Sequence, residues 1–589
     1  MRYHAIGAAP GIAVGPAFNL PQWEYELPDR IVDAAQLGHE LQRLYEGVSI
    51  SKSEIEELKR DISDYFSEEE LRIFDAHIAI LEDPQFIKEV QNVIREQYKV
   101  AEVAVKEVMD QFSHLFEQLE DQVMQHRSLD IRDVGNRLLK HLIGSMHVVE
   151  PPDTPYIVVA KELTPSQLAH LDPARLKGIV LLSGSPNSHT AIMARALGIP
   201  CVVGLENQLR TPIQSGDLLI IDGVRGIIEV NPDERTLEKV RLMQEEHHRI
   251  HAELETIARL PTVTTDGIPV QLLANIGFVT EIQDELLRNA EGVGLHRTEF
   301  EYLHRMIWPA EDQLYASYRS AVEKLAGRPY VIRTLDIGAD KQLPYYEFAK
   351  EDNPSLGVRA IRFSLQHRDK FRTQLRAIVR ASRHGPIKLM YPFISSVDEI
   401  REANRMLAEV KEELARELPA EGSGESAARM SIETGIMVEL PAAVTIIDLL
   451  LEEVDFISIG SNDLVQYLLA VDRMNPKVAN LYDPYHPAVL RAFRRIVEAA
   501  RAANKPVSVC GELAGVPEYA PIWIGLGITR LSMSQPAILP LKKHIRNLSA
   551  AHCRELTEEL FRLRTSEEIR DRVVRFMQSV GDDRISADY

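Results

Sequence analysis

Residues 184–200 read GSPNSHTAIMARALGIP and combine a turn with the start of a helix. The first part consists of turn-forming residues, Gly184, Ser185, Pro186 and Asn187. In the second part apolar side chains recur at helical spacing, at Ile192, Met193, Ala196 and Leu197. The stretch therefore predicts a loop followed by a short amphipathic helix that begins at His189.

His189 would then lie at a helix N-terminus, where backbone N–H groups are unpaired and the helix dipole is positive. This setting stabilises an anion and disfavours an imidazolium, so a ring nitrogen stays nucleophilic near neutral pH. The hydroxyls of Ser188 and Thr190 could hydrogen-bond a phosphoryl group on that nitrogen or orient the ring. A histidine that only caps the helix fits the same residues, and the stretch alone leaves both interpretations open.

Short β-branched runs surround this stretch, namely YIVVA, GIVLLS, PCVVG, DLLIIDG and GIIEV from residue 156 onward. They predict a compact α/β unit that ends near residues 231–232. Residues 234–258 follow as one charged helix that joins two halves, and its start is a candidate hinge. Its three histidines, His247, His248 and His251, are more typical of a solvated helix face than of a metal site.

The chain before this unit is predominantly helical. Residues 1–20 predict a short strand and a tight turn, and apolar spacing then predicts a long helix over residues 34–62. A second helix is expected from Ser67 to Pro84, and further helical patterns fill residues 84–116 and 130–143. Residues 25–145 therefore form a predicted helical bundle, whose acidic faces either receive a carrier protein or are simply solvated.

Beyond residue 264 strands and helices alternate. Eight strand-like runs contain LLANIG, GVGLHRTEF, YVIRTLDIG, KLMYPFIS, GIMVELP, DFISIGSND, PVSVCGE and RLSMS. This alternation over about 250 residues or more predicts a (β/α)8 barrel of the TIM type, in which chemistry occurs at the C-terminal ends of the strands. The fold class is thus multidomain α/β.

Charged and polar residues are concentrated at those predicted strand ends. They are Arg297, Glu299, Arg333, Asp336, Lys341, Glu439, Asn462, Asp463, Arg473 and Glu512. Each alone fits a surface salt bridge, but several cations converging on one barrel mouth predict a site for a small polyanion. Glu439 and Asp463 supply the hard oxygen ligands that Mg²⁺ prefers, so they are the candidate metal ligands.

Cys510 lies at another of these strand ends, in SVCGELAG. A free cysteine is most often a small buried core residue. Beside cations and a metal, however, its thiol proton would be available to a developing carbanion, and its position favours this acid role.

Composition limits the class of protein. With 589 residues, 45% of them hydrophobic and 26% charged, the chain predicts about three globular domains and no membrane span. The N-terminus lacks a signal-peptide pattern, and only three cysteines occur, so a cytoplasmic location is expected. The net charge of -21 argues against nucleic acid as a partner. The same negative charge would suit a basic protein partner, or it serves only to keep the protein soluble.

Taken together, the motifs resemble enzyme I of the phosphoenolpyruvate:sugar phosphotransferase system over essentially the whole chain. They are APGIAVG, NSHTAIMARALGIPCVVG, GLHRTEFEYL, RTLDIGADKQLPY, NPSLGVRAIR, MVELPAA, DFISIGSNDLVQYLLAVDR and CGELAG. The resemblance implies an enzyme that transfers the phosphoryl group of phosphoenolpyruvate to its own histidine and releases pyruvate. The resemblance further implies that the phosphorylated enzyme passes the group to a histidine of the carrier protein HPr, as the first step of sugar uptake.

The same resemblance implies roles for individual residues. His189 is the phosphorylated residue, and Cys510 protonates the enolate. Phosphoenolpyruvate is contacted by Arg297, Arg333, Asn462, Asp463 and Arg473. Mg²⁺ is bound by Glu439 and Asp463.

The domain organisation follows in the same way. Residues 1–24 and 146–232 correspond to the α/β phosphohistidine domain, and residues 25–145 to a bundle that binds HPr. Residues 233–262 correspond to a linker helix, and residues 263–589 to the barrel, which binds phosphoenolpyruvate and forms a homodimer.

Three features depart from the family pattern: Asn187 replaces a threonine, His296 replaces an apolar residue, and residues 419–426 extend a surface loop. None removes a group that the chemistry needs.

Three alternatives remain: a regulatory, nitrogen-type paralogue, a dikinase-like phosphoenolpyruvate enzyme, and a relative that only binds phosphoenolpyruvate. A dikinase requires a nucleotide-binding domain, and the roughly 150 residues before the histidine unit contain no Gly-rich phosphate loop.

Overall fold

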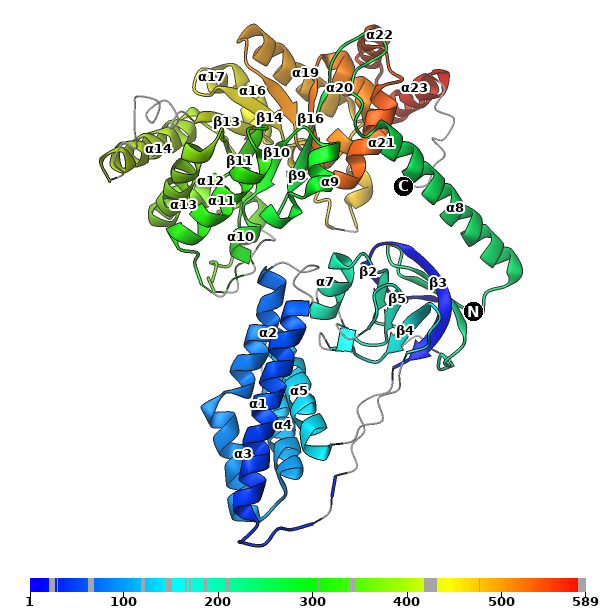
Figure 1. Ribbon diagram of the computed structural model, residues 1–589. Helices are drawn as coiled ribbons and strands as arrows, with labels where there is room; N and C mark the ends of the chain where they lie inside the picture. Colours follow the sequence, from blue (N-terminus) through cyan, green and yellow to red (C-terminus); the bar gives the residue numbers. More distant parts are fainter. Residues whose placement is uncertain are drawn as a thin grey trace. The chain divides into compact units, whose positions relative to one another are not determined.

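The computed structural model shows two compact units, residues 1–247 and residues 248–589 (Figure 1). It describes residues 1–20, 27–28, 30–61, 68–117, 122–144, 151–164, 167–168, 171–184, 188–206, 209, 211–303, 305, 307–338, 341, 343, 345–417, 432–475 and 477–580. The boundary between the units falls inside helix α8 (Glu234–Ile257), which begins where the sequence predicts the charged helix. Within the described residues, no helix is both long enough and apolar enough to cross a membrane.

The first unit contains an eight-stranded sheet in the order β1-β8-β7-β3-β4-β5-β6-β2. Its strands are β1 (Arg2–His4), β2 (Ile6–Ala9), β3 (Ile12–Asn19), β4 (Tyr156–Ala160), β5 (Leu176–Leu181), β6 (Cys201–Val203), β7 (Leu218–Asp222) and β8 (Ile227–Val230). All five residues of β4 are buried, because Tyr156, Val158 and Ala160 pack in one hydrophobic cluster and Ile157 and Val159 pack in another on the opposite face. One strand was predicted in residues 1–20, which is wrong: three strands form there, separated at Ala5 and at Gly11, whose φ of 124° favours glycine.

Five helices form the predicted bundle, and they enter the chain between β3 and β4. They are α1 (Leu37–Asp61), α2 (Glu68–Leu81), α3 (Pro84–Gln97), α4 (Ala101–Glu117) and α5 (Gln122–Ile143). The helical patterns expected over residues 84–116 form two helices, and Tyr98 ends the first of them, α3, in the left-handed conformation at φ 57°. Ser67, the expected start of the second helix, lies outside the described residues.

The second unit is a closed barrel of eight parallel strands, which confirms the predicted fold class. Its strands are β9 (Gln271–Ile276), β10 (Val293–Arg297), β11 (Tyr330–Arg333), β12 (Lys388–Tyr391), β13 (Glu433–Val438), β14 (Phe456–Ile459), β15 (Val507–Val509) and β16 (Arg530–Met533). Each coincides with one of the eight runs named from the sequence. The apolar and β-branched composition of these strands suits a parallel sheet whose two faces are both buried.

Helices surround the barrel and extend beyond it (Figure 1). They are α9 (Asp284–Asn289), α10 (Phe300–Leu303), α11 (Glu311–Leu325), α12 (Ile361–Gln366), α13 (Arg368–Ala381), α14 (Val397–Glu417), α16 (Pro441–Thr445), α17 (Ile447–Leu451), α18 (Ser461–Leu469), α19 (Pro487–Ala502), α20 (Ala520–Leu526), α21 (Gln535–Ile545), α22 (Ala550–Leu560) and α23 (Ser566–Ser579). The extension at residues 419–426 lies outside the described residues.

The residues that follow α8 are hydrogen-bonded to side chains in and just after α21 of the barrel unit. The buried Lys542 donates a hydrogen bond from Nζ to the carbonyl of Ala258 at 2.6 Å, and Arg546 donates one to the carbonyl of Pro261 at 2.5 Å. These cations satisfy carbonyls just beyond the helix end, where the dipole is negative. The end of the linker is therefore held by charge as well as by packing.

Candidate active site

Helix α7 (His189–Ala196) begins at His189, as the turn-and-helix pattern predicts. Ser188 is the N-cap, and its Oγ accepts a hydrogen bond from the backbone N–H of Ala191 at 3.3 Å. The hydroxyl of Thr190 is buried and donates to the carbonyl of Leu163. The sequence left open that the Thr190 hydroxyl hydrogen-bonds a phosphoryl group or orients the ring, whereas in the structure its proton is donated to this backbone carbonyl. The side chain of His189 and all of Asn187 lie outside the described residues.

The other predicted site residues are all in the barrel unit. Arg297 and Arg333 are the last residues of adjacent strands and are paired in register. Glu439 follows β13, and Cys510 follows β15. Asn462 and Asp463 lie in the first turn of α18, directly after β14. Because the C-terminal ends of parallel barrel strands form one face, these residues share one mouth of the barrel.

A buried ion-pair cluster forms the base of this mouth. Arg333 Nη2 lies 2.6 Å from Glu299 Oε1 and 3.1 Å from Asp336 Oδ2. Lys341 Nζ lies 2.8 Å and 3.1 Å from the same two oxygens. Burial by itself would raise the pKa of Glu299, but Arg333 and Lys341 outweigh it and lower the pKa to about 2. Both carboxylates therefore remain charged and hold Arg333 in place.

Arg359 is a member of this site that the strand-end analysis missed. It is 5% exposed, and its Nη2 lies 3.1 Å from Asp336 Oδ1 and 3.4 Å from Asp463 Oδ2. Its guanidinium carbon lies 4.5 Å from the centroid of the Phe393 ring, within cation–π range. Arg359 follows a long loop after β11 and ends no strand. The only sequence signal for it was its place in the motif NPSLGVRAIR.

Asn462 and Asp463 are oriented by neighbouring side chains. Arg473 Nη1 lies 2.9 Å from Asp463 Oδ1. Asn462 Nδ2 donates to Glu512 Oε1 at 3.0 Å, and the backbone N–H of Glu512 donates to Asn462 Oδ1 at 2.8 Å. The polar groups that follow β14 and β15 are therefore joined by direct hydrogen bonds.

Glu439 is a buried carboxyl group that has both carboxylates and arginines as neighbours. It is 1% exposed, and the backbone N–H of Phe393 donates to its Oε1 at 2.6 Å. Burial raises the pKa of Glu439 to about 8, and the charges of Asp463 and Asp336 raise it in the same direction. A divalent cation beside Glu439 and Asp463 would relieve this repulsion, so the residues fit a metal site.

Within the described residues, no group of three or more His, Cys, Asp or Glu side chains is arranged to hold a metal ion. The candidate metal ligands from the sequence are the two carboxylates of Glu439 and Asp463. This number suits Mg²⁺, which is usually bound through one or two carboxylates together with water and substrate phosphates.

Cys510 is buried beneath the mouth at 2% exposure. It packs in the barrel interior with Leu295, Met390, Met437 and Phe456. Burial raises the pKa of its thiol to about 11, so the proton is retained at neutral pH. The site thus contains a protonated thiol beside its charged groups, and this environment fits a core residue as well as a proton donor.

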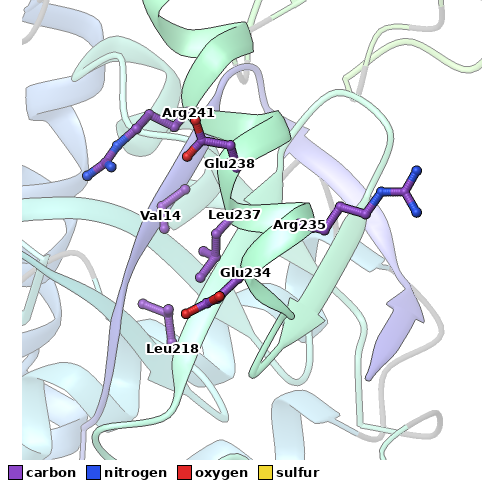
Figure 2. A pocket seen from close by; sticks show the side chains of 7 residues that line it. All are labelled: Val14, Leu218, Glu234, Arg235, Leu237, Glu238 and Arg241. Atoms are coloured by element: carbon purple, nitrogen blue, oxygen red, sulfur yellow. The ribbon is translucent and has the colours of Figure 1, made fainter.

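A separate cavity of about 770 Å³ lies in the first unit, between the first turns of α8 and strands β3 and β7 (Figure 2). Its apolar lining comes from Val14, Leu218 and Leu237, while Arg235 and Arg241 extend to opposite sides of the helix in Figure 2. No residue predicted to bind substrate lines it. The cations and buried carboxylates described above lie at the barrel mouth, in the other unit.

Comparison with known proteins places this arrangement in a family. Residues 4–127, 152–226 and 251–550 match families described as PEP-utilising enzyme, N-terminal, mobile domain and PEP-binding domain, respectively. The chain is 40% identical over 568 residues to the phosphoenolpyruvate-protein phosphotransferase of Geobacillus stearothermophilus, covering 96% of each protein. The chain belongs to the phosphoenolpyruvate-protein phosphotransferase family.

Two further relatives carry the same name. The phosphotransferase of Priestia megaterium is 40% identical and is matched over 98% of each chain. That of Bacillus subtilis (strain 168) is also 40% identical, with 96% of this chain and 97% of the relative covered. The resemblance found from the sequence motifs is thus confirmed, and the chain is an enzyme of this phosphotransferase family.

His296, which departs from the family pattern, lies on the outer side of the barrel wall. It is 0% exposed, and its Nδ1 lies 2.7 Å from the hydroxyl of Tyr330. Burial lowers its pKa to about 4, so the ring is neutral at physiological pH. His296 is therefore a structural residue that leaves the charge of the site unchanged.

Proposed function

We propose that this chain transfers the phosphoryl group of phosphoenolpyruvate to His189, releases pyruvate, and then phosphorylates a histidine of the carrier HPr. The observation that carries the proposal is the barrel mouth, where Arg333 and Arg359 are held by carboxylates beside Glu439 and Asp463. A site of this charge suits a small substrate that bears both a phosphate and a carboxylate. The named relatives support the same reaction.

Each part of the chain then has a role. Residues 1–24 and 146–232 act as the phosphohistidine domain, and residues 25–145 as the surface that receives HPr. Residues 233–262 link this half to the barrel at residues 263–589, which binds phosphoenolpyruvate and forms a homodimer. The three free, buried cysteines fit a reducing, cytoplasmic location.

Phosphoenolpyruvate is clamped through its phosphate and carboxylate by Arg297, Arg333 and Arg473, with Asn462 and Asp463 as further polar contacts. Since phosphoryl transfer needs little covalent help from a protein, positioning and charge stabilisation by these residues supply most of the acceleration. His189 Nε2 or Nδ1 attacks phosphorus in line, and the departing enolate takes a proton from the Cys510 thiol to become pyruvate.

Mg²⁺ is the cofactor that fits this site, with Glu439 and Asp463 as its protein ligands. When bound, it supplies positive charge to the phosphate oxygens of the substrate. Its ligands suit this purpose because Asp463 and Asp336 raise the pKa of Glu439, and a further cation beside these carboxylates would favour the charged form of Glu439.

The direct test incubates the full chain with radiolabelled phosphoenolpyruvate and Mg²⁺. Acid-labile label on the chain, release of pyruvate, and transfer of the label to added HPr are expected, and a chelator should stop all three. Labelling from ATP and not from phosphoenolpyruvate would identify a dikinase-like enzyme. Binding without any release of pyruvate would identify a relative that only binds phosphoenolpyruvate.

Replacing Cys510 with serine or alanine tests the proton donor. Loss of a general acid is expected to slow release of pyruvate by about a hundred-fold or more, while the affinity for phosphoenolpyruvate is retained. Because burial raises the pKa of the thiol to about 11, the wild-type rate should show no fall from thiol ionisation between pH 7 and about 9. Substitution of Cys553, which is buried elsewhere in the barrel unit, is the matched control. Alanine at position 510 with a wild-type rate would exclude the acid role.

A further inference from the structure

A buried amide outside the barrel wall contacts the strand end that carries Arg333. Gln374 lies on α13 and is 1% exposed, although the other buried residues of that helix are mostly apolar. Its Oε1 accepts a hydrogen bond from the backbone N–H of Leu335 at 3.0 Å. Its Nε2 donates to Thr298 Oγ1 at 3.0 Å and to the Tyr318 hydroxyl at 3.4 Å.

Thr298 extends the same network to the backbone. Its hydroxyl accepts from Gln374 and donates to the carbonyl of Arg333 at 2.8 Å. Thr298 is fully buried, as is Tyr318. Two side chains, one from α13 and one just after β10, therefore bind the carbonyl of Arg333 and the N–H of Leu335.

The geometry of a parallel sheet explains why these bonds are needed. The backbone N–H of Thr334 donates to the carbonyl of Met390 on β12 at 3.0 Å. Successive residues of a strand direct their backbone groups to opposite neighbours, so Arg333 and Leu335 face the side of β10. Strand β10 ends at Arg297, which is paired in register with Arg333, so Leu335 lies beyond the last residue of that strand. A buried peptide group without a partner is destabilising, and the side chains of Thr298 and Gln374 supply hydrogen bonds to this backbone where β10 ends.

The backbone segment that these residues hold carries two charged groups of the site. Arg333 lies at one end and Asp336 follows Leu335 directly, and their side chains pair at 3.1 Å. We propose that Gln374 and Thr298 are positioning residues for phosphoryl transfer, which fix the backbone from Arg333 to Leu335 and so aim Arg333 at the substrate. This inference rests on the proposed function.

Because a small displacement of a positioned group slows a reaction strongly, Gln374→Met is expected to lower kcat for pyruvate formation by roughly ten-fold to a hundred-fold. Thr298→Val keeps the shape of threonine but removes the hydroxyl, and a similar loss is expected. Thr298→Ser restores the hydroxyl and should recover most of the rate. The double variant Gln374→Met with Thr298→Val should lose little more than either single variant, since both belong to one network.

The matched control is Asn404→Leu on α14. Asn404 also bridges two groups outside the barrel wall, because it accepts from the Tyr391 hydroxyl at 3.2 Å and donates to the carbonyl of Glu453 at 3.1 Å. It contacts no backbone group next to Arg333. Its variant is expected to lose stability while kcat is retained, which separates positioning from a general loss of packing.

Three outcomes would count against the inference. It is overturned if Gln374→Met, at a temperature where it is fully folded, has the kcat of Asn404→Leu. It is also overturned if Thr298→Ser is as slow as Thr298→Val. A wild-type chain that releases no pyruvate from phosphoenolpyruvate overturns the proposed function, and the inference falls with it. The activity of the wild-type chain therefore distinguishes the two failures.

Discussion

Replacing His189 with alanine is expected to abolish phosphorylation of HPr by phosphoenolpyruvate, with a loss of roughly a thousand-fold or more in rate. In the proposed relay every transferred phosphoryl group passes through this imidazole, and alanine offers no nucleophile. Acid-labile label on the chain should disappear together with transfer to HPr. Binding of phosphoenolpyruvate should persist, because the barrel mouth is unchanged.

The fold of the first unit should tolerate this substitution. Helix α7 is capped by Ser188, whose Oγ accepts from the N–H of Ala191, and this bond does not involve the imidazole. Alanine has a high helix propensity, so the unfolding midpoint should stay near that of the wild type. His4→Ala, an exposed histidine on β1, is the control and should phosphorylate HPr normally. If His189→Ala still charged HPr at the wild-type rate, the relay through this residue would be refuted.

Much of the barrel could be predicted from sequence because its signals are local. Eight short apolar runs with turns between them define the strands, and the charged residues just after each run define the mouth. Arg297, Arg333 and Glu439 were found in this way. Parallel topology alone is enough to bring such residues together, so no knowledge of packing was needed.

Other features depend on contacts that are distant in sequence. Arg359 joins the site from a loop, and its role depends on ion pairs with Asp336 and Asp463 that no periodicity reveals. The hydroxyl of Thr190 is used by the carbonyl of Leu163, which lies 27 residues earlier in the chain. The end of α3 at Tyr98 comes from a change in one backbone angle. Sequence spacing contains no information about such partners.

Arg333 and Arg473 are proposed to bind the same substrate but differ in burial, so their substitution should separate binding from stability. Arg333 is 7% exposed in its side chain and pairs with Glu299 and Asp336. Arg473→Met should cost less than about 1 kcal/mol of stability, since its side chain is 35% exposed and forms one pair, with Asp463. Arg333→Met should cost about 3 kcal/mol, because two buried carboxylates lose a cation: Glu299 then keeps only Lys341, while Asp336 keeps Lys341 and Arg359.

Both variants should have a much lower rate of pyruvate release from phosphoenolpyruvate. Removing one charged contact to a phosphate or carboxylate is expected to lower kcat/KM for phosphoenolpyruvate by about a hundred-fold. Denaturant unfolding measures the stability difference, and pyruvate release at a temperature where both variants are folded measures the catalytic loss. Equal unfolding free energies would mean that Glu299 and Asp336 are neutralised without Arg333. A wild-type rate in Arg473→Met would show that Arg473 does not contact the substrate.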